Sequence, residues 1–472
     1  MDVKLLTAIF VILLIIVGIG AFYAGMIYGG GAPIQGGQTT QWKPPEKIKA
    51  AWVYVGPIGD FGWTYAHDVG RRVVATLFSD WLETTYVENI DENRVAEVID
   101  NLVSKGYNVI FTTSFDHMQK TYEKAQQYPN VMFFHCSGYM RRPNMGTYFA
   151  DLYQVYYLNG LMAGALTKTG HIGYVAAHTI PEVVRHINAF AIGAKEVGEM
   201  LNKDIKVHVI EIGSWFDPDK ARAAARTLYE QYNVDVIAYT EDSTAIIEYA
   251  EQITQEYLNG ERDRPLYVFS HYSPGWIYGK DAVVSGQLVR WEVIYADILI
   301  KIKAGIYTPY NLEHVDYWYL LNTGAVDLGA HIYENGSVMH INPKFIPILK
   351  NITVRDKIYG DQVSVYELVM RRYYMFKEAP LLEPLQISSV SHIFESKGKI
   401  RIPPVDPNKP DLGSKVDHYI STIFDPFTGP LEGYNITNPN QKITIPAGKR
   451  LTHDDLWTMD WFLTYVEYIG KT

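Results

Sequence analysis

The sequence contains a single cysteine, Cys136, among 472 residues. One thiol can build neither an intramolecular disulfide framework nor a cysteine-rich zinc site. Charged residues are also few, at 20%, and acidic residues exceed basic ones by 52 to 42, which gives a formal net charge of -10. A nucleic-acid module held by bulk positive charge is therefore excluded. The 47% of hydrophobic residues excludes an intrinsically disordered chain as well.

Common catalytic and cofactor-binding motifs are missing too. The sequence has no Walker A loop, no H-E-x-x-H, no G-x-S-x-G, and no G-x-G-x-x-G that follows a strand and opens a helix. Its 14 histidines are dispersed along the chain without tight metal-ligand spacing. We therefore expect no catalytic centre, no metal site and no cofactor.

A long uncharged run is present near the beginning, at residues 5–28. About 20 apolar residues suffice to cross the hydrocarbon core of a bilayer. Residues 1–28 are therefore predicted to be a membrane anchor, with a cleaved signal segment as the alternative. Residues 29–46 are rich in Gly, Gln, Thr and Pro, which is typical of a flexible linker. We expect an uncleaved anchor with the body of the chain outside the membrane.

The body of the chain alternates short runs rich in Val, Ile, Phe and Tyr with amphipathic segments. This alternation predicts βα units and parallel sheets. The expected strands fall in two series, at 48–56, 84–90, 108–114 and 131–137, and at 171–177, 206–213, 234–241 and 266–273. Two such α/β halves that face each other form a cleft beyond the carboxyl ends of their strands, where open α/β sheets bind ligands.

Helix ends can be predicted at two places. Apolar residues at helical spacing between Asp91 and Gly106 predict a helix, with Asp91 as its N-cap and Gly106 as its C-terminal stop. Near the end of the chain, Thr452 and Asp455 have the spacing of a capping box. We expect an aromatic helix to follow that box and to continue through Tyr465.

The loop after the first expected strand carries residue types that suit a ligand site. Its sequence, VGPIGDFGWTYAHDVG at 55–70, combines several glycines with an acid at Asp60 and an aromatic ring at Trp63, where a helix begins. Backbone amides and an aromatic face would meet there. A glycine turn with a packed tryptophan explains this pattern equally well.

The segment GDFGWTYAHDVG, at 59–70, resembles the D-x-S-F-N-x-x-x-x-x-G motif that opens the basic membrane protein family. This family of ABC-transporter substrate-binding proteins includes the bacterial purine nucleoside receptor. The resemblance covers nearly all of residues 47–470 except 378–415, and its further segments are 144–177, 180–197, 214–231 and 281–295. Taken together and in this order, the segments are specific for the family.

The resemblance implies an α/β fold of the type I periplasmic-binding class, with two Rossmann-like lobes joined by three crossings and closed by a hinge. The first lobe is expected to contain residues 47–155 and 275–315. The second is expected to contain 156–274 and 316–472, with a surface insertion near 378–415.

The resemblance also implies a set of ligand-binding residues. In nucleoside-binding members of the family, aromatic rings from both lobes enclose the base. The opening motif places Asp60 at the family's acid, Trp63 at its Phe and Thr64 at its Asn. The other candidates stand at strand ends or in matched second-lobe segments, and they are Ser114, Asn188, Phe190, Trp215, Phe216, Asp242, His271 and Tyr272.

Two departures from the family pattern affect the expected ribose contacts. His271 or Tyr272 stands where the family usually has an Asp. The lysine that the nucleoside binders carry downstream is missing, with Gln287, Val289 and Arg290 in its vicinity. A purine nucleoside is therefore one candidate ligand beside other small polar molecules.

The expected function is an extracytoplasmic solute-binding protein of an ABC importer, without enzymatic activity. It would capture a small, nucleoside-like ligand and deliver it to the permease and ATPase subunits. The lipid bilayer would be a partner through the N-terminal helix, and no nucleic acid is expected. The alternatives are a ligand-sensing ectodomain of the same fold and a structural cell-surface protein. A nucleosidase would need a tuned acid-base pair or a metal cluster, and Asp60 with Asp242 is too little to indicate one.

Overall fold

The computed structural model of the chain describes residues 42–334, 336–377 and 424–472. All helices and strands of these residues lie in one compact unit, formed by Pro44–Ile332 and Val338–Thr472. No helix in the described ranges combines the length and the hydropathy needed to cross a bilayer. The expected anchor at 1–28 and the expected insertion at 378–415 fall outside these ranges.

The first sheet has six strands, all parallel, in the order β2-β1-β3-β4-β5-β11. Its strands are β1 (Ile48–Val53), β2 (Leu82–Val87), β3 (Val109–Thr112), β4 (Met132–Cys136), β5 (Met145–Ala150) and β11 (Asp316–Tyr319). The helices of this lobe are α2 (Trp63–Leu77), α3 (Val95–Ser104), α4 (Met118–Gln127) and α9 (Trp291–Lys303). Strands β3, β4 and β5 are buried along their whole length, because helices cover both faces of a parallel sheet.

The second sheet has seven strands in the order β12-β10-β9-β8-β6-β7-β20. Its strands are β6 (His171–Ala176), β7 (Lys206–Glu211), β8 (Val236–Tyr239), β9 (Tyr267–Ser270), β10 (Val283–Val289), β12 (Val326–Leu328) and β20 (Val466–Lys471). Only β12 runs antiparallel to its neighbour. The main helices of this lobe are α5 (Tyr153–Leu166), α6 (Pro181–Met200), α7 (Pro218–Gln231) and α8 (Ala245–Leu258).

Both lobes begin with the same strand order, because β2-β1-β3-β4-β5 in the first matches β7-β6-β8-β9-β10 in the second. All eight strands expected from the hydrophobic runs are present, each within a few residues of its expected bounds. Short runs with strong β propensity and turn residues at both ends were sufficient to locate them.

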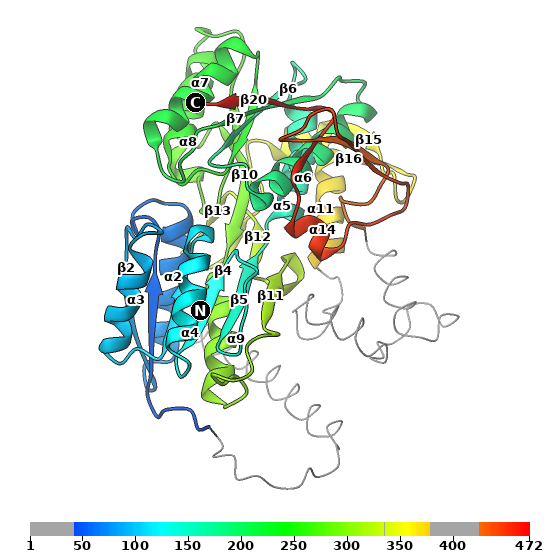
Figure 1. Cartoon of the computed structure of the whole chain (residues 1–472). Coiled ribbons are helices and arrows are strands. Elements are labelled where there is room, and N and C mark those ends of the chain that lie inside the picture. The colour runs from blue at the N-terminus through cyan, green and yellow to red at the C-terminus, as the bar shows by residue number, and fades with distance from the viewer. Residues whose placement is uncertain (1–41, 335, 378–423) are drawn as a thin grey trace. The chain divides into compact units, whose positions relative to one another are not determined.

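The chain crosses between the lobes after β5, after β10 and after β11. In Figure 1, α9 and β11 are yellow-green and lie beside the blue and cyan elements of the first lobe, although they come much later in the sequence. The expected lobe boundaries at 275 and 316 put β10 in the first lobe and β11 in the second, whereas the sheets contain them the other way round. The reason is that β10 pairs in parallel with β9 of the second sheet, and the chain returns to the first lobe only after β10.

The helix expected after Asp91 is present as α3, but Asp91 is not its N-cap. The Asp91 carboxylate accepts hydrogen bonds from the backbone N–H groups of Asn93 and Arg94, at 2.9 and 3.2 Å. It therefore closes a turn that precedes the helix, and Arg94 occupies the N-cap position. Gly106 ends the segment with a φ of 84°, a conformation that glycine adopts without steric cost.

The capping box at Thr452 and Asp455 is confirmed, since each side chain accepts a hydrogen bond from the other residue's backbone N–H. The helix behind it is nevertheless short. It ends at Trp457 as α14 (His453–Trp457), and the next residues form strand β19 (Trp461–Leu463), which pairs with β17 (Leu431–Asn435). The expected continuation through Tyr465 is therefore wrong, because pairing with a distant strand overrides the local helical pattern.

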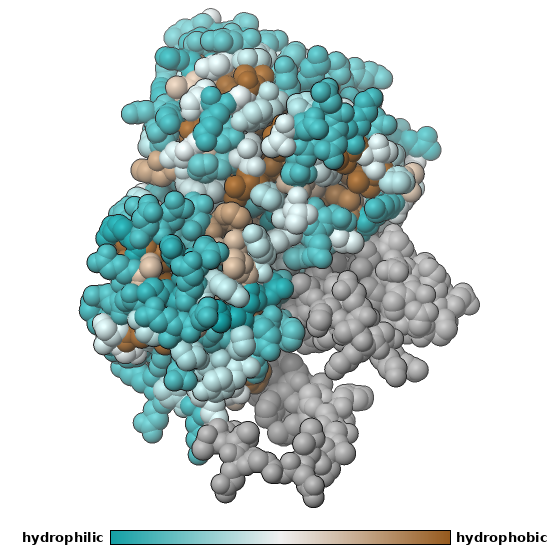
Figure 2. Space-filling view, in the orientation of Figure 1, coloured by the Kyte–Doolittle hydropathy of each residue, from teal (hydrophilic) through white to brown (hydrophobic). Residues whose placement is uncertain are grey.

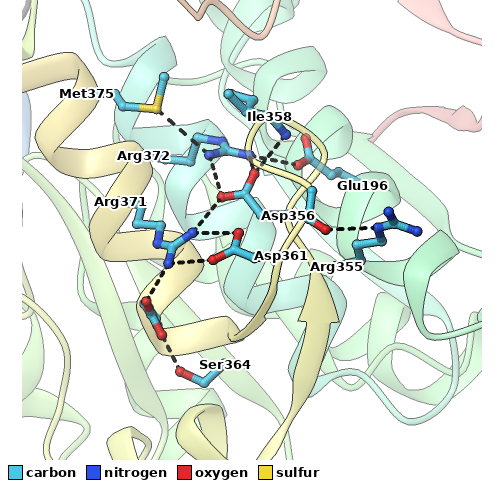
Figure 3. Close-up of polar contacts among 11 residues, drawn as sticks. Glu196, Arg355, Asp356, Ile358, Asp361, Ser364, Arg371, Arg372 and Met375 are labelled. Carbon is cyan, nitrogen blue, oxygen red and sulfur yellow. Dashed lines mark hydrogen bonds and ion pairs between the residues drawn. The ribbon is translucent and has the colours of Figure 1, made fainter.

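A buried ion pair stabilises the segment after β12 and lies against α6 of the second lobe. Arg372, on α11 (Val365–Lys377), is fully buried, and its Nη2 lies 2.6 Å from Oδ1 of Asp356. The same nitrogen lies 3.8 Å from Oε1 of Glu196 on α6 (Figure 3). Burial alone would raise the pKa of Asp356, but the hydrogen bonds and charge of Arg372 outweigh it and hold the pKa below its usual value. Charges buried this deeply require a partner.

Candidate ligand-binding pocket

A pocket of about 320 Å³, part of it open to solvent, lies beyond the carboxyl ends of the strands of both sheets. It is lined by Val55, Trp63, Ser114, Phe115, Ser137, Ile180, Glu182, Trp215, Asp242 and Tyr272. The first five belong to the first lobe and the other five to the second.

The distribution of hydrophobic residues on the surface agrees with a ligand site buried between the lobes. Figure 2 shows a face on which hydrophilic residues dominate, while hydrophobic residues come to the surface in small patches, some of them in the band between the two lobes. The loops that follow β1, β3 and β4 line the pocket on one side, and the loops that follow β6, β7, β8 and β9 line it on the other. This is where open α/β sheets bind ligands.

The two lobes touch each other directly at this pocket. The backbone N–H of Trp63 donates to Oδ1 of Asp242 at 2.8 Å, and the Ser137 hydroxyl donates to Oε2 of Glu182 at 2.5 Å. The Trp63 and Tyr272 rings meet edge to face, with centroids 5.1 Å apart. These contacts define a closed arrangement of the lobes.

Asp60 organises the loop that carries Trp63. Its carboxylate accepts hydrogen bonds from the backbone N–H groups of Gly62, Thr64 and Tyr65, at 2.9, 3.0 and 2.9 Å. Thr64 in turn accepts a hydrogen bond from the Gly56 N–H through its hydroxyl, at 3.2 Å. Burial raises the pKa of Asp60, although the three N–H donors oppose this. Both predicted residues therefore shape the loop and do not line the pocket.

The aromatic residues of the site differ in how free they are to contact a ligand. Trp63 is only 8% exposed, its Nε1 donates to the Thr113 carbonyl at 2.5 Å, and its ring packs against Tyr272 and Trp291. Phe115, in the 3-10 turn η1 (Phe115–His117), and Trp215 are half-buried and line the pocket from opposite lobes. Two rings are thus available for stacking, and only Trp215 was predicted.

Carboxyl groups dominate the polar side of the pocket. Burial raises the pKa of Asp242 well above its ordinary value, and the nearby Asp60 carboxylate raises it further. Glu241, beside it, has its pKa raised to about 7 by burial. None of the ten lining residues is Lys, Arg or His. The pocket can therefore accept hydrogen bonds from a ligand, and a protonated Asp242 can also donate one. It offers no cation to bind a phosphate or carboxylate.

Glu241 makes the stability of the protein depend on pH. Its carboxyl is fixed by the Asp217 N–H at 3.1 Å and by the Ser243 N–H at 3.0 Å. Between its ordinary pKa of 4.5 and its folded value of about 7, the folded protein binds more protons than the unfolded chain. The free energy of unfolding is therefore expected to fall as pH rises through this window, by up to about 3 kcal/mol from this group.

Denaturant titrations at pH 5, 6, 7 and 8 measure this dependence. The Glu241→Gln variant should show a flatter profile between pH 5 and 7, whereas Glu248→Gln, at an exposed position on the same lobe, should keep the wild-type profile. A Glu241→Gln profile as steep as that of the wild type would contradict the assignment.

Five of the eleven predicted ligand-binding residues line the pocket, namely Trp63, Ser114, Trp215, Asp242 and Tyr272. The other six lie outside it: Asp60 and Thr64 shape the loop that carries Trp63, and the remaining four are elsewhere in the second lobe. Phe216 is 42% exposed, and Phe190 is fully buried against Tyr174 and Phe269. His271 is buried behind Tyr272, with its Nδ1 2.6 Å from the Tyr156 hydroxyl.

Asn188 is the fourth, and it has a structural role. Its amide nitrogen donates to the Trp461 carbonyl at 2.8 Å, and its amide oxygen accepts from the Leu463 N–H at 3.1 Å. Asn188 therefore holds strand β19 against α6, which is why that segment does not continue as a helix. In the second lobe, matching a family motif located the right segment but not which side chain faces the pocket.

Sequence reasoning missed the other half of the lining. Those residues are Val55, Phe115, Ser137, Ile180 and Glu182. All stand just after the expected strands or at the start of the helix that follows, so position at a strand end was a usable signal. In the parts of the chain that the structure describes, no group of three or more His, Cys, Asp or Glu residues could hold a metal ion.

Two α/β lobes of matching topology with a pocket between them define a solute-binding protein of the periplasmic-binding type. A family model described as "ABC transporter substrate-binding protein PnrA-like" matches residues 47–366, and the chain belongs to this family. It is an extracytoplasmic binding protein of an ABC transporter and not an enzyme, as the sequence predicted.

Similar proteins support this assignment. A purine-binding protein of Brucella abortus is 35% identical over 309 residues, 65% of this chain and 79% of that protein. A putative ABC transporter glucose-binding protein of Haloferax volcanii is 34% identical over 296 residues, 63% of this chain and 68% of that protein. The crystal structure of an Aeropyrum pernix solute-binding protein shares the fold, with a TM-score of 0.56 at 16% identity over 74% of this chain and 96% of that one.

Proposed function

We propose that the protein captures a purine base or nucleoside for import. The observation that carries this proposal is the lining of the pocket, where Phe115 and Trp215 face the site from opposite lobes and Asp242 and Glu182 supply hydrogen-bond acceptors. A flat heteroaromatic ring between two side-chain rings buries apolar area with little directional constraint. Its amino group, or a ribose hydroxyl, would donate to the carboxylates.

Two other ligand classes fit the pocket less well. A nucleotide would bring its phosphate beside Asp242 and Glu182, with no cation in the lining to compensate. A sugar carries hydroxyls all around the edge of its ring and needs more polar partners than a purine base does, because a buried hydroxyl without a partner is costly. Six of the ten lining residues here are aliphatic or aromatic. One relative is named as purine-binding and the other as glucose-binding, so the comparison of a purine with glucose is the most informative test.

Thermal unfolding of the full chain with candidate ligands tests the proposal. A ligand that binds only the folded state stabilises it by about 2.7 kcal/mol at a concentration of 100 times its Kd. We expect a raised Tm with purines and purine nucleosides, and none with nucleoside 5′-monophosphates or glucose. A response to glucose alone would reject the purine assignment and leave the solute-binding class intact.

Replacing Trp215 by alanine should weaken ligand binding by roughly 10- to 100-fold, by analogy with the range of about 1–3 kcal/mol measured for stacking on bases. The matched control is Phe216→Ala, at the neighbouring exposed position, which should leave affinity unchanged. Isothermal titration calorimetry with adenosine measures both. Equal affinities of the two variants would remove Trp215 from the site.

We further propose that residues 1–28 anchor the protein in the membrane and that the body delivers its ligand to the permease and ATPase subunits. The uncharged run at 5–28 supports the anchor through its length. Carbonate extraction of membranes tests it, since an anchored chain stays in the pellet and a cleaved one is released.

A further inference from the structure

Glu182 is held by hydroxyl groups from both lobes. It stands in the first turn of α6, is 7% exposed, and lines the pocket. Its Oε2 accepts the Ser137 hydroxyl of the first lobe at 2.5 Å. Its Oε1 accepts the Tyr272 hydroxyl of the second lobe at 2.9 Å. Its carboxylate therefore has this fixed orientation only when the two lobes are together.

Both residues that hold Glu182 have an unusual backbone conformation. Ser137 has a φ of 67° and Tyr272 a φ of 57°, in the left-handed region that side chains other than Gly, Asn and Asp rarely adopt. The other described non-glycine residues with positive φ are Phe61, in the loop that carries Trp63, and three asparagines, Asn89, Asn202 and Asn233. Such strain persists where the surrounding structure enforces it, often at ligand-binding positions. Here it aims both hydroxyls at one carboxylate.

The Glu182 carboxylate retains acceptor capacity beyond its two hydroxyl partners. The carboxylate lies at the N-terminal end of a 20-residue helix, and the partial positive charge of a helix N-terminus stabilises a negative group there. An ionised carboxylate only accepts hydrogen bonds, at about four lone-pair positions on its two oxygens. Ser137 and Tyr272 occupy two of them, which leaves acceptor capacity for a ligand.

We propose that Glu182 is a specificity-determining residue that accepts a hydrogen bond from one N–H or O–H group of the ligand. This proposal rests on the proposed purine function and adds to it the residue that selects for a donor. It makes recognition depend on closure, because the lobes must meet before Ser137 and Tyr272 together orient the carboxylate. It also gives a reason to reject anionic ligands, whose oxygens would face a fixed negative charge.

The experiment is a mutant cycle in the full chain with Glu182→Gln, which keeps the shape of the side chain and removes its charge. Affinities are measured for adenosine and for four analogues that each lack one donor: purine riboside, 2′-deoxyadenosine, 3′-deoxyadenosine and 5′-deoxyadenosine. A hydrogen bond to a charged group corresponds to roughly 10- to 100-fold in affinity. We expect this loss for adenosine and three analogues, and a loss below about threefold for the one analogue that lacks the recognised donor.

Three outcomes would overturn the proposal. A uniform loss across all five ligands would mean that Glu182 acts through folding or closure alone. No loss for any ligand would remove Glu182 from recognition. If the wild-type protein binds neither adenosine nor any other purine or purine nucleoside, the proposed function fails and this proposal fails with it, a result distinct from the other two.

Two further variants separate recognition from stability. Ser137→Ala removes one orienting hydrogen bond and should reduce the affinity for adenosine by roughly 2- to 10-fold. The analogue that loses least affinity with Glu182→Gln should again lose least with Ser137→Ala. Glu92→Gln, at an exposed position on the first lobe, should behave as the wild type. A Ser137→Ala variant that singles out a different analogue would contradict the assigned geometry.

Discussion

Replacing Gly62 by alanine is expected to lower ligand affinity by roughly 10- to 100-fold without unfolding the protein. A Cβ atom at this position would lie 2.3 Å from Oδ1 of Asp242 and 2.6 Å from its Cα. The two residues belong to opposite lobes, and the Cα of Asp242 cannot move without its strand end. The extra methyl group therefore destabilises the closed arrangement, by an amount typical of overpacking, about 1–3 kcal/mol.

Gly59, in the same loop, provides the matched control. A Cβ atom there would meet nothing within 4 Å, so Gly59→Ala should bind as the wild type. Calorimetry gives the affinities, and small-angle scattering with saturating ligand shows whether the lobes still close. Wild-type affinity in Gly62→Ala would mean that ligand binding does not require the approach of Asp242 to the Trp63 loop.

The largest expected effect on stability comes from Arg372→Ala. This change takes from the fully buried Asp356 its nearer counter-charge, with only Arg371 left at 3.5 Å, and deprives Glu196 of its neighbour. Removing one partner of a buried pair costs about 3–5 kcal/mol, because the other charge stays buried and uncompensated. The free energy of unfolding, measured by denaturant titration with circular dichroism, should fall by this amount.

The preceding residue supplies a control within the same helix. Arg371 is half-buried; it pairs with Asp361 at 2.9 Å and with Glu367 at 2.7 Å, and it also lies 3.5 Å from Oδ2 of Asp356 (Figure 3). Its outer pairs contribute about 0–1 kcal/mol, and Asp356 keeps Arg372 at 2.6 Å, so Arg371→Ala should destabilise the protein clearly less than Arg372→Ala. Similar losses in both variants would show that the buried Asp356–Arg372 pair is not what stabilises this segment.

Much of the fold could be predicted from the chain itself. The apolar runs at 48–56 and 171–177, for example, are the strands β1 and β6, because a strand covered on both faces must be apolar along its length. The helix before Gly106 and the capping box at Thr452 were also predictable, since spacing and capping are local properties. The family was indicated by segments in a specific order.

The candidate site was predicted only in part. Trp215 and Asp242 stand directly after strands of the second lobe, and both line the pocket. Asn188 and Phe190 lie in a matched segment but on the sides of α6 that face β19 and the core. A motif match places a segment near the site, whereas the direction of each side chain depends on how the helix packs.

By itself the sequence determined the α/β class, the two series of strands, the acidic character and the lack of catalytic motifs. The tertiary structure decided that β10 and β11 belong to opposite sheets, that Trp461 lies in a strand, and that Ser137 and Tyr272 meet at Glu182. Helical and strand periodicity act over a few residues, so they can be read along the chain. The pocket joins residues as far apart as Trp63 and Asp242, and their approach depends on how two separately folded lobes pack against each other.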